Sequence, residues 1–424
     1  MTISQLGLRM WYAANRAREE GLWWTTKEVY FRASLWMVWF CLIPVSLPLH
    51  LLGFRRLPVL TQRIGHLAAE IDCFLKEIQL GQIDIARKYY FVLAPESRVA
   101  NLCLLDYWRE HVTVVSDPFL CWVLGLMTRG PLMRHDIQNY VLAVGCAAKY
   151  YSVSAVWAER PALLHLRSEH KARGEKFLAE VGVPTSAWFV CVHDRDIGYS
   201  TKDERVHAYR NTTVENLLPA MREIVARGGW CIRMGEPSTK PLPAMVGVID
   251  YAQHFSRSAE LDIFLCASCR FFLGNTSGLF LVSSVFGVPV ALTNQTPFAA
   301  TGFRPGDLSI PKLIKRRGNS EFMTSVEILS SPISNFRMSR LYSDAQLELI
   351  ENSEDEILDL TLEMIDTLEG RFNESPILDK YRAAFTHYLT PNHYCFGAEG
   401  QMAGNFILRH PNIFKIPHKN ELHR

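Results

Sequence analysis

Short apolar runs alternate with helix-like segments through the middle of the chain. The runs predict buried strands at 188–192, 230–234, 246–250, 271–273 and 288–292, and apolar residues at helical spacing predict helices at 216–226, 259–266 and 279–286. Strands and helices that alternate in this way are typical of a parallel, doubly wound sheet. Ligands of such sheets lie beyond the carboxyl ends of the strands, so we expect the binding residues there.

A second α/β unit precedes this sheet. The sequence predicts a helix that begins near residue 63, strands at 89–94 and 112–115, and a helix at 99–107. We therefore expect an α/β protein with two facing Rossmann-like domains, 57–175 and 176–353. A capped amphipathic helix at 354–370 opens the remaining segment, 354–424, which we expect to pack back on the first domain.

An apolar run without a formal charge, residues 33–54, stands before both domains. It is long enough to reach roughly across a hydrocarbon core, but Pro44 and Pro48 interrupt its second half and basic residues flank both ends. We expect residues 1–56 to form a membrane-associating segment, amphipathic and then apolar, in which a broken helix dips into one leaflet. The alternative is a helical pair buried against the first domain.

Composition excludes several classes of protein. The chain has 424 residues, of which 48% are hydrophobic and 21% are charged, as in globular proteins of two domains. A formal net charge of +2 argues against a dedicated nucleic-acid binder. Cys266 and Cys269 form one C-x-x-C, but no second pair completes a metal set among the ten scattered cysteines, so we infer a reducing compartment.

The turn at 275–278 is the clearest candidate for a ligand site. It follows one predicted strand and leads into a predicted helix, so it presents backbone amides, a hydroxyl group and a helix dipole at one point. These groups suit a phosphate. We therefore expect Asn275, Thr276, Ser277 and Gly278 to bind the phosphates of a nucleotide, the alternative being a strand-to-helix turn that binds nothing.

Residues at the ends of the neighbouring strands extend this site. His193 and Gly235 follow two of the predicted strands. We expect Arg195 to hold the phosphates as a bidentate, permanently charged clamp in an open cleft. Further cations are reserve candidates, for which a surface or salt-bridged role stays open: Arg210, Arg233 and, more weakly, Lys312.

The motifs together resemble a family of uncharacterised bacterial glycosyltransferases of the GT-B type. The resemblance covers most of residues 60–370 and rests on the stretches 63–67, 190–196, 209–211, 232–235, 249–251, 262–266 and 273–278. It implies an acceptor domain at 57–175 and a nucleotide-sugar donor domain at 176–353. The His193-x-Arg195 pair also resembles the H-x-R of GDP-fucose-dependent fucosyltransferases, where the arginine meets the donor phosphates. Asp196 replaces their second arginine, so a fucosyl donor is not implied.

Glycosyl transfer also needs a base for the acceptor hydroxyl, and the acceptor domain supplies a candidate. Gly65 and His66 stand at a predicted helix start, where the helix dipole keeps the imidazole neutral and able to accept a proton. Glu70, one turn later, orients His66 or serves as the base itself. The alternative is a structural histidine. Asp194-x-Asp196 matches a metal-binding D-x-D, but Arg195 between the acids supplies positive charge, so we predict neither a metal nor a cofactor.

The sequence therefore predicts a glycosyltransferase at the cytoplasmic face of the bacterial inner membrane, peripheral or monotopic. Its partners would be a nucleotide-sugar donor, a glycan or lipid-linked glycan acceptor in surface polysaccharide synthesis, and the membrane surface, with no nucleic acid. Direct displacement, hence inversion, is the expected course. Two alternatives stay open, a nucleotide-sugar epimerase of the same architecture and a non-catalytic sugar-binding subunit of a polysaccharide assembly.

Overall fold

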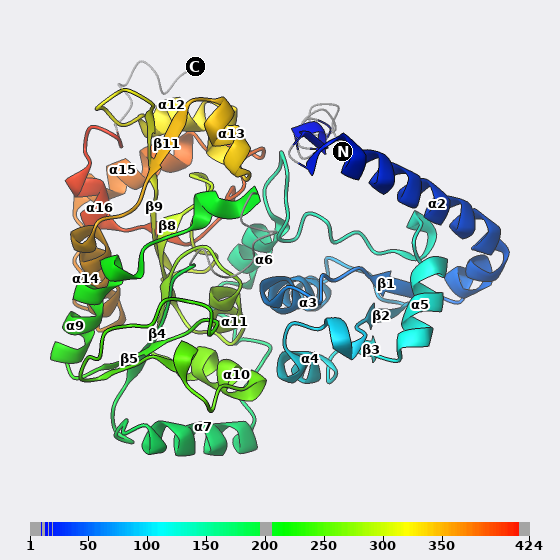
Figure 1. The fold of residues 1–424 in the computed structure, drawn as a ribbon, viewed down its shortest axis with the longest axis horizontal. Helices are drawn as coiled ribbons and strands as arrows, with labels where there is room; N and C mark the ends of the chain where they lie inside the picture. Colours follow the sequence, from blue (N-terminus) through cyan, green and yellow to red (C-terminus); the bar gives the residue numbers. More distant parts are fainter. Residues whose placement is uncertain (1–9, 11–12, 16, 19, 196–205, 415–424) are drawn as a thin grey trace. The chain divides into compact units, whose positions relative to one another are not determined.

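The computed structural model describes residues 10, 13–15, 17–18, 20–195 and 206–414 (Figure 1). The chain forms two compact units, Met1–Val144 and Gly145–Arg424. This division lies before the expected 175/176 boundary. The rings of Tyr151 and Phe303 pack with their centroids 4.4 Å apart, and α7 (Ser168–Glu180) packs against α10 (Ala259–Ser268). Residues 145–175 therefore belong to the second unit.

A three-stranded parallel sheet organises the first unit. Its strands lie in the order β1 (Phe54–Leu57), β2 (Tyr89–Leu93) and β3 (Thr113–Val115). Helices α3 (Ile64–Gln79) and α4 (Leu102–Trp108) pack together, and α5 (Pro118–Met127) packs on β2 (Figure 1). The strands predicted at 89–94 and 112–115 are confirmed. Strand β1 lies outside the predictions, because its Phe-Arg-Arg-Leu sequence carries two charges.

Helix α2 (Leu22–Leu51) is one continuous helix of 30 residues. It contains both Pro44 and Pro48, so the prediction of a broken helix is wrong. The prolines are four residues apart and share one helix face, which confines the lost backbone hydrogen bonds to that face. Only 11% of its most apolar window is buried, which contradicts the alternative of a buried helical pair.

Two side chains fix the middle of α2 to the first unit. Trp39 is buried, with its ring in the space where a Cβ on Gly130 would stand. The buried Ser46 hydroxyl donates hydrogen bonds to the carbonyl oxygens of Leu42, at 2.9 Å, and Met127, at 3.2 Å. Through these contacts α2 packs along α5 and the short 3-10 helix η2 (Pro131–Met133).

The second unit contains a seven-stranded parallel sheet in the order β12-β9-β8-β7-β4-β5-β6. The strands are β4 (Phe189–His193), β5 (Trp230–Arg233), β6 (Val248–Ile249), β7 (Phe272–Gly274), β8 (Val290–Gln295), β9 (Leu308–Pro311) and β12 (Gln401–Met402). The chain runs from β4 outward to β6 and then returns to β7 beside β4. The order of the strands therefore reverses between β4 and β7.

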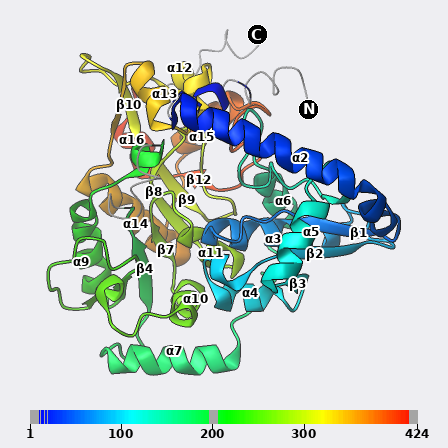
Figure 2. The same ribbon diagram turned by 45° about the vertical axis from the view of Figure 1, so that its right-hand side comes forward.

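Helices cover both faces of this sheet. α9 (Leu218–Ala226) packs with α14 (Glu354–Leu368) on one face, and α10 packs with α11 (Leu279–Val285) on the other (Figures 1 and 2). Strands β4 to β8 and helices α9 to α11 confirm the predicted alternation, with ends shifted by a few residues. The sequence pattern succeeded because the central strands are buried apolar runs.

The C-terminal residues complete the second unit. Ser353 caps α14 as predicted, and the helix packs on β8 and β9 through its buried Ile357, Leu360 and Met364. Strand β12 pairs with β9 at the sheet edge. The described residues of 354–424 therefore belong to the second unit, and their packing on the first domain stays a prediction. The remaining elements of this unit are β10 (Leu313–Arg316), its antiparallel partner β11 (Leu347–Ile350), α6 (Lys149–Trp157), α12 (Ser325–Leu329), α13 (Ser339–Asp344), α15 (Pro376–His387) and α16 (Gly404–Arg409).

Candidate functional site

The strand order reverses at the point where most of the predicted donor residues lie. His193 ends β4 and pairs with Gly274, which ends β7. A Cβ on Gly274 would stand 2.4 Å from the carbonyl oxygen of His193, so only glycine allows this approach. The segments that follow the two strands carry Arg195 and Asn275. A reversal of strand order leaves a crevice at the carboxyl edge, which is the usual ligand site of doubly wound sheets.

Arg195 is held by the segment that contains Asn211. Its Nε donates to Asn211 Oδ1 at 3.2 Å, and its carbonyl oxygen accepts from the Thr212 amide at 3.0 Å. Only 8% of Arg195 is exposed, so the expected open cleft around it is wrong. Asn275 Nδ2 donates to Thr212 Oγ1 at 2.9 Å and to the Arg210 carbonyl at 3.2 Å. These bonds tie residues 210–212 to the ends of both β4 and β7.

Two further cations join this network. Arg210 donates from Nε to the carbonyl oxygen of Thr276 at 3.0 Å, and burial, with smaller repulsion from Arg195, lowers its pKa to about 10. Lys312 Nζ donates to the Asn211 carbonyl at 2.6 Å, and burial lowers its pKa to about 8. Among the described residues neither Arg210 nor Lys312 forms an ion pair with a carboxylate. The point between β4 and β7 where the strand order reverses, called the switch point below, is therefore a buried cationic site. Such a site suits an anion.

The turn at 275–278 lies against these cations. The Thr276 hydroxyl donates to Gln295 Oε1 and accepts from the Thr296 amide at 3.4 Å. Within the described part of the chain, the buried Ser277 hydroxyl and Asn275 Oδ1 have no hydrogen-bond partner. Helix α11 is only seven residues long, so its dipole is weak and the cations carry most of the positive charge. Gly278 has φ −83°, which any residue adopts.

His193 is a neutral group at this edge. Its Nδ1 lies 3.2 Å from the carbonyl oxygen of Met234 and donates to it, which leaves Nε2 as an acceptor. Burial lowers the pKa of His193 below its usual 6.5. It therefore adds no positive charge at neutral pH. Gly235 directly follows Met234 beyond β5, on the same edge as the other predicted donor residues.

Arg233 has a structural role. It is fully buried, and its guanidinium bonds Asp194 Oδ1 at 3.2 and 3.3 Å and Asp250 Oδ1 at 3.3 Å. The Leu242 amide donates to the other Asp250 oxygen at 2.8 Å. This triad links the ends of β4, β5 and β6. The interpretation of Arg233 as a reserve phosphate clamp is wrong, and its salt-bridged alternative is confirmed.

The same triad bears on metal binding. Asp194, the first acid of the predicted D-x-D match, is engaged by Arg233, and Asp196 lies outside the described residues. No group of three histidine, cysteine, aspartate or glutamate side chains is placed to hold a metal ion in the described part of the chain. Metal independence stays a prediction.

The candidate base lies at the start of α3 in the first unit. Helix α3 begins at Ile64, so Gly65 and His66 are in its first turn, as predicted. His66 Nδ1 lies 2.8 Å from Glu70 Oε1, and the Leu60 amide donates to Glu70 Oε2 at 3.0 Å. A carboxylate held in this way accepts the Nδ1 proton of a neutral imidazole, which leaves Nε2 as the basic nitrogen. The structure thus brings His66 and Glu70 together as a dyad, while the catalytic role of each stays a prediction.

Several residues of the donor site show no functional signal in the sequence. Asn211, Thr212 and Gln295 hold the predicted cations and hydroxyl groups, but each lies on a connecting segment or late in a strand. Lys312 lies in the site only through its contact with Asn211, 101 positions away in the chain. Asn211 lies in the stretch 209–211 that carries the family resemblance, but nothing in that stretch indicates its contact with Arg195.

No protein-family model and no curated protein sequence matches the chain. Solved structures that match it include E. coli ADP-heptose LPS heptosyltransferase II, with a TM-score of 0.42, 11% identity, and coverage of 74% of this chain and 100% of that one. The iron-containing dodecameric glycosyltransferase TibC from enterotoxigenic E. coli H10407 has a TM-score of 0.38 and 11% identity, covering 75% and 77%. The family 9 glycosyl transferase from Veillonella parvula has a TM-score of 0.35 and 11% identity, covering 57% and 80%.

These matched proteins are glycosyltransferases, and they give no support to the fucosyltransferase resemblance. TM-scores below 0.5 at 11% identity do not assign a function to this chain. The functional assignment therefore depends on the residues of the site.

Proposed function

We propose that the protein is a glycosyltransferase that takes its sugar from a nucleotide-sugar donor bound at the switch point of the second unit. The observation that carries the proposal is the convergence of Arg195, Arg210 and Lys312 on Asn211 and Thr276 at that point. Cations buried beyond the ends of parallel strands are suited to a diphosphate. A diphosphate is the group that leaves when a sugar is transferred from a nucleotide sugar.

Each part of the reaction has a candidate group. The cations would neutralise the charge that develops on the leaving diphosphate, and losing one such buried contact costs about 2–5 kcal/mol. His66 would take the proton of the acceptor hydroxyl through Nε2, with Glu70 fixing the tautomer. Attack opposite the leaving group would invert the anomeric centre. This chemistry needs no metal and no cofactor from the protein.

The acceptor in this proposal is a glycan or lipid-linked glycan at the cytoplasmic face of the inner membrane. Helix α2 supports a membrane location, because its exposed side includes Tyr30, Phe31, Met37 and Phe40. Its length of about 45 Å would suffice for a span. However, Trp39 and Ser46 fix the middle of the helix to the first unit, so a span would draw that unit into the bilayer. A helix that lies in the membrane interface agrees better with these contacts.

Turnover with a panel of nucleotide sugars tests the proposal. The full-length protein with a membrane lipid extract should release the nucleoside diphosphate and transfer labelled sugar to the extract. Conversion of one nucleotide sugar into its epimer would instead show an epimerase. Binding of the nucleotide sugars without either reaction would show a non-catalytic sugar-binding subunit.

A further inference from the structure

The first unit contains a cavity of about 850 Å³ at the carboxyl ends of its parallel strands. Residues 58–62 after β1 and Pro95, Ser97 and Arg98 after β2 line it, together with α5, which follows β3. Ligand sites of parallel sheets lie at this edge. None of the residues predicted for the donor site contributes to this cavity, so it is a separate site.

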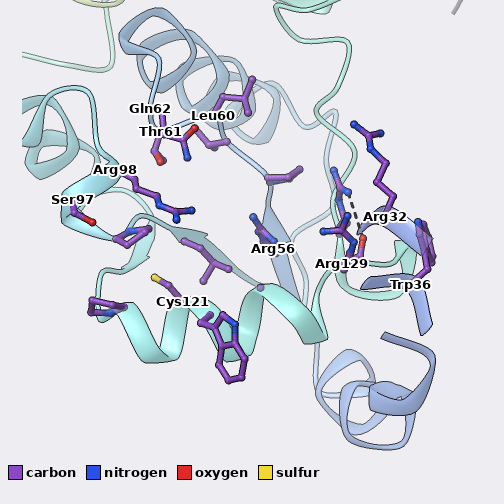
Figure 3. Close-up of a pocket in the computed structure, with 18 residues that line it drawn as sticks. Arg32, Trp36, Arg56, Leu60, Thr61, Gln62, Ser97, Arg98, Cys121 and Arg129 are labelled. Atoms are coloured by element: carbon purple, nitrogen blue, oxygen red, sulfur yellow. Dashed lines mark hydrogen bonds between the residues drawn. The ribbon is translucent and has the colours of Figure 1, made fainter. Parts of the chain in front are cut away.

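Of the described residues, five arginines and no carboxylate line the cavity: Arg32, Arg56, Arg98, Arg129 and Arg134. Arg32 is paired with Glu28 at 2.6 Å. In the described part of the chain, the other four form no ion pair with an acid. Figure 3 shows Arg56 and Arg98 turned toward the same space from different elements. Four guanidinium groups without an ion-paired acid around one cavity indicate an anionic ligand.

The fold holds these charges together at a cost. The backbone of Arg134 forms a parallel bridge with that of Arg56, and the Arg56 Nη1 donates to Thr128 Oγ1 at 3.3 Å. The Nε atoms of Arg56 and Arg129 are buried and make no hydrogen bond within the described residues. Burial, with repulsion from Arg134, lowers the pKa of Arg56 to about 10. A ligand with several negative charges would offset the repulsion between the arginines and would accept hydrogen bonds from the two Nε atoms.

Apolar side chains that are exposed to solvent also line the cavity. Trp36 of α2 and Trp122 of α5 line it, and they are 41% and 62% exposed. The exposed Phe119 and Leu120 continue the apolar surface along α5. A ligand that touches both the arginines and these residues must have a strongly anionic end and a hydrocarbon part.

We propose that this cavity binds the phosphate or diphosphate end of a membrane-inserted lipid, whose hydrocarbon chain leaves past Trp36 and Trp122. Charge complementarity favours a phosphate monoester or diphosphate over an ordinary phospholipid. A monoester carries about −1.5 to −2 charge, whereas a phosphodiester carries a single negative charge. A flat membrane surface would be met by exposed cations, but Arg56, Arg129 and Arg134 are half-buried around a cavity.

The position of the cavity suggests what this lipid does. Leu60 lines the cavity, and its amide is held by Glu70, the residue that orients His66. A glycan attached to the lipid phosphate would begin beside the segment that Glu70 fixes. In this step the inference rests on the proposed function, since only a glycosyltransferase would use the bound lipid as its acceptor. The binding of the lipid does not depend on that function.

Binding of farnesyl diphosphate to the full-length protein in mild detergent, measured by calorimetry, tests the inference. Farnesol lacks the diphosphate and inorganic pyrophosphate lacks the chain. Both should bind at least about tenfold more weakly, because each loses one half of the contacts. Equal affinity for pyrophosphate would overturn the lipid assignment, and equal affinity for farnesol would overturn the role of the arginines.

Variants locate the binding. Arg56→Gln and Arg98→Gln should each weaken farnesyl diphosphate binding by about 10- to 100-fold, the effect of losing a hydrogen bond between charged groups. Arg98 is exposed, so its variant should fold even if Arg56→Gln does not. Arg109→Gln is the matched control, since Arg109 pairs with Asp106 at 3.2 Å and does not line the cavity. Unchanged binding in Arg98→Gln and in folded Arg56→Gln would overturn the inference.

Nucleotide-dependent stabilisation of the same variants separates this inference from the proposed function. It should equal that of the unmodified protein. Its loss in Arg98→Gln would make the cavity a nucleotide site and overturn the lipid proposal. If no nucleotide stabilises any form of the protein while lipid binding still needs the arginines, the proposed function fails and the lipid site stands.

Discussion

At the scale of single residues, variants of His66 and Glu70 test which of the two is the general base. His66→Ala should lower turnover by about 10²- to 10⁴-fold with little change in nucleotide affinity, because general-base catalysis acts in the transition state. Glu70→Gln should lower turnover by a smaller factor, because it leaves the imidazole of His66 misoriented. Initial rates and nucleotide affinities of both variants would be compared with those of His111→Ala, an exposed histidine of the same unit. A larger loss in Glu70→Gln than in His66→Ala would transfer the role of base to Glu70.

Lys312 gives the donor site a pH dependence. Since burial lowers the pKa of Lys312 to about 8, the ammonium loses its charge as the pH rises through 8. Nucleotide affinity should therefore fall above pH 8, approaching about tenfold per pH unit for one linked proton. Lys312→Arg keeps the charge and should flatten the profile between pH 7.5 and 9.5, as measured by calorimetry. Identical profiles for the two proteins would exclude Lys312 from the site.

The stability of the protein should change in the opposite direction over the same pH range. The pKa of Lys312 in the unfolded chain is near 10.5, above its folded value, so between pH 8 and 10.5 the unfolded chain binds more protons. The contribution of Lys312 to stability thus increases as the pH rises through this window. Below pH 8 the Lys312 side chain is charged in the folded protein, so the full desolvation penalty of the buried ammonium group lowers the stability.

Arg233 should matter for stability rather than for donor binding. Arg233→Met leaves the buried Asp194 and the half-buried Asp250 without their cation, and the loss of a partner from a buried charge destabilises proteins by about 3–5 kcal/mol. Denaturant unfolding would measure this change, with Arg222→Met on the exposed side of α9 as the control. Equal midpoints for the two variants would contradict a structural triad.

Residue types at strand ends could be predicted from the sequence, but their partners could not. Arg195 and Asn275 follow apolar strands, and this position alone placed them at the ligand edge. Arg233 also ends an apolar strand, but its burial and its ion pairs depend on the side chains that neighbouring strands place beside it. Asp194 and Asp250 come together only when β4, β5 and β6 pair.

At the scale of elements, the exposed apolar side of α2 is expected to hold the protein at the membrane. Met37→Glu with Phe40→Glu should move the protein from the membrane to the soluble fraction, because a charged side chain costs about 2.5–3.5 kcal/mol at the centre of a membrane and less near its surface. Fractionation of cells would measure the shift, with Phe255→Glu on the second unit as the control, since Phe255 is 94% exposed. The proposed membrane location would be wrong if the double variant and the control fractionated alike.

The elements that the sequence missed share a physical cause. Strands β10 and β11 pair although they lie more than thirty positions apart, and the two residues of β12 become a strand only through β9. Neither the β10–β11 pair nor β12 shows a local sequence pattern that predicts a strand. Strand β1 is hidden by its arginines, and the second of them lines the cavity of the first unit. Local periodicity therefore predicts the central strands. It fails where paired strands lie far apart in the sequence, or where a strand carries residues that line a cavity.

At the scale of the whole molecule, a glycosyltransferase of this architecture must bind a nucleotide at the switch point of the second unit. A thermal-shift screen with ADP, UDP, GDP, CMP and dTDP on the full-length protein tests this most directly. A nucleotide present at a hundredfold its dissociation constant should stabilise the fold by about 2.7 kcal/mol. Arg195→Gln should lose this stabilisation, and Arg222→Gln on α9 should retain it. If no nucleotide stabilises the protein, or if Arg195→Gln is stabilised as much as the unmodified protein, the donor site does not lie at this switch point.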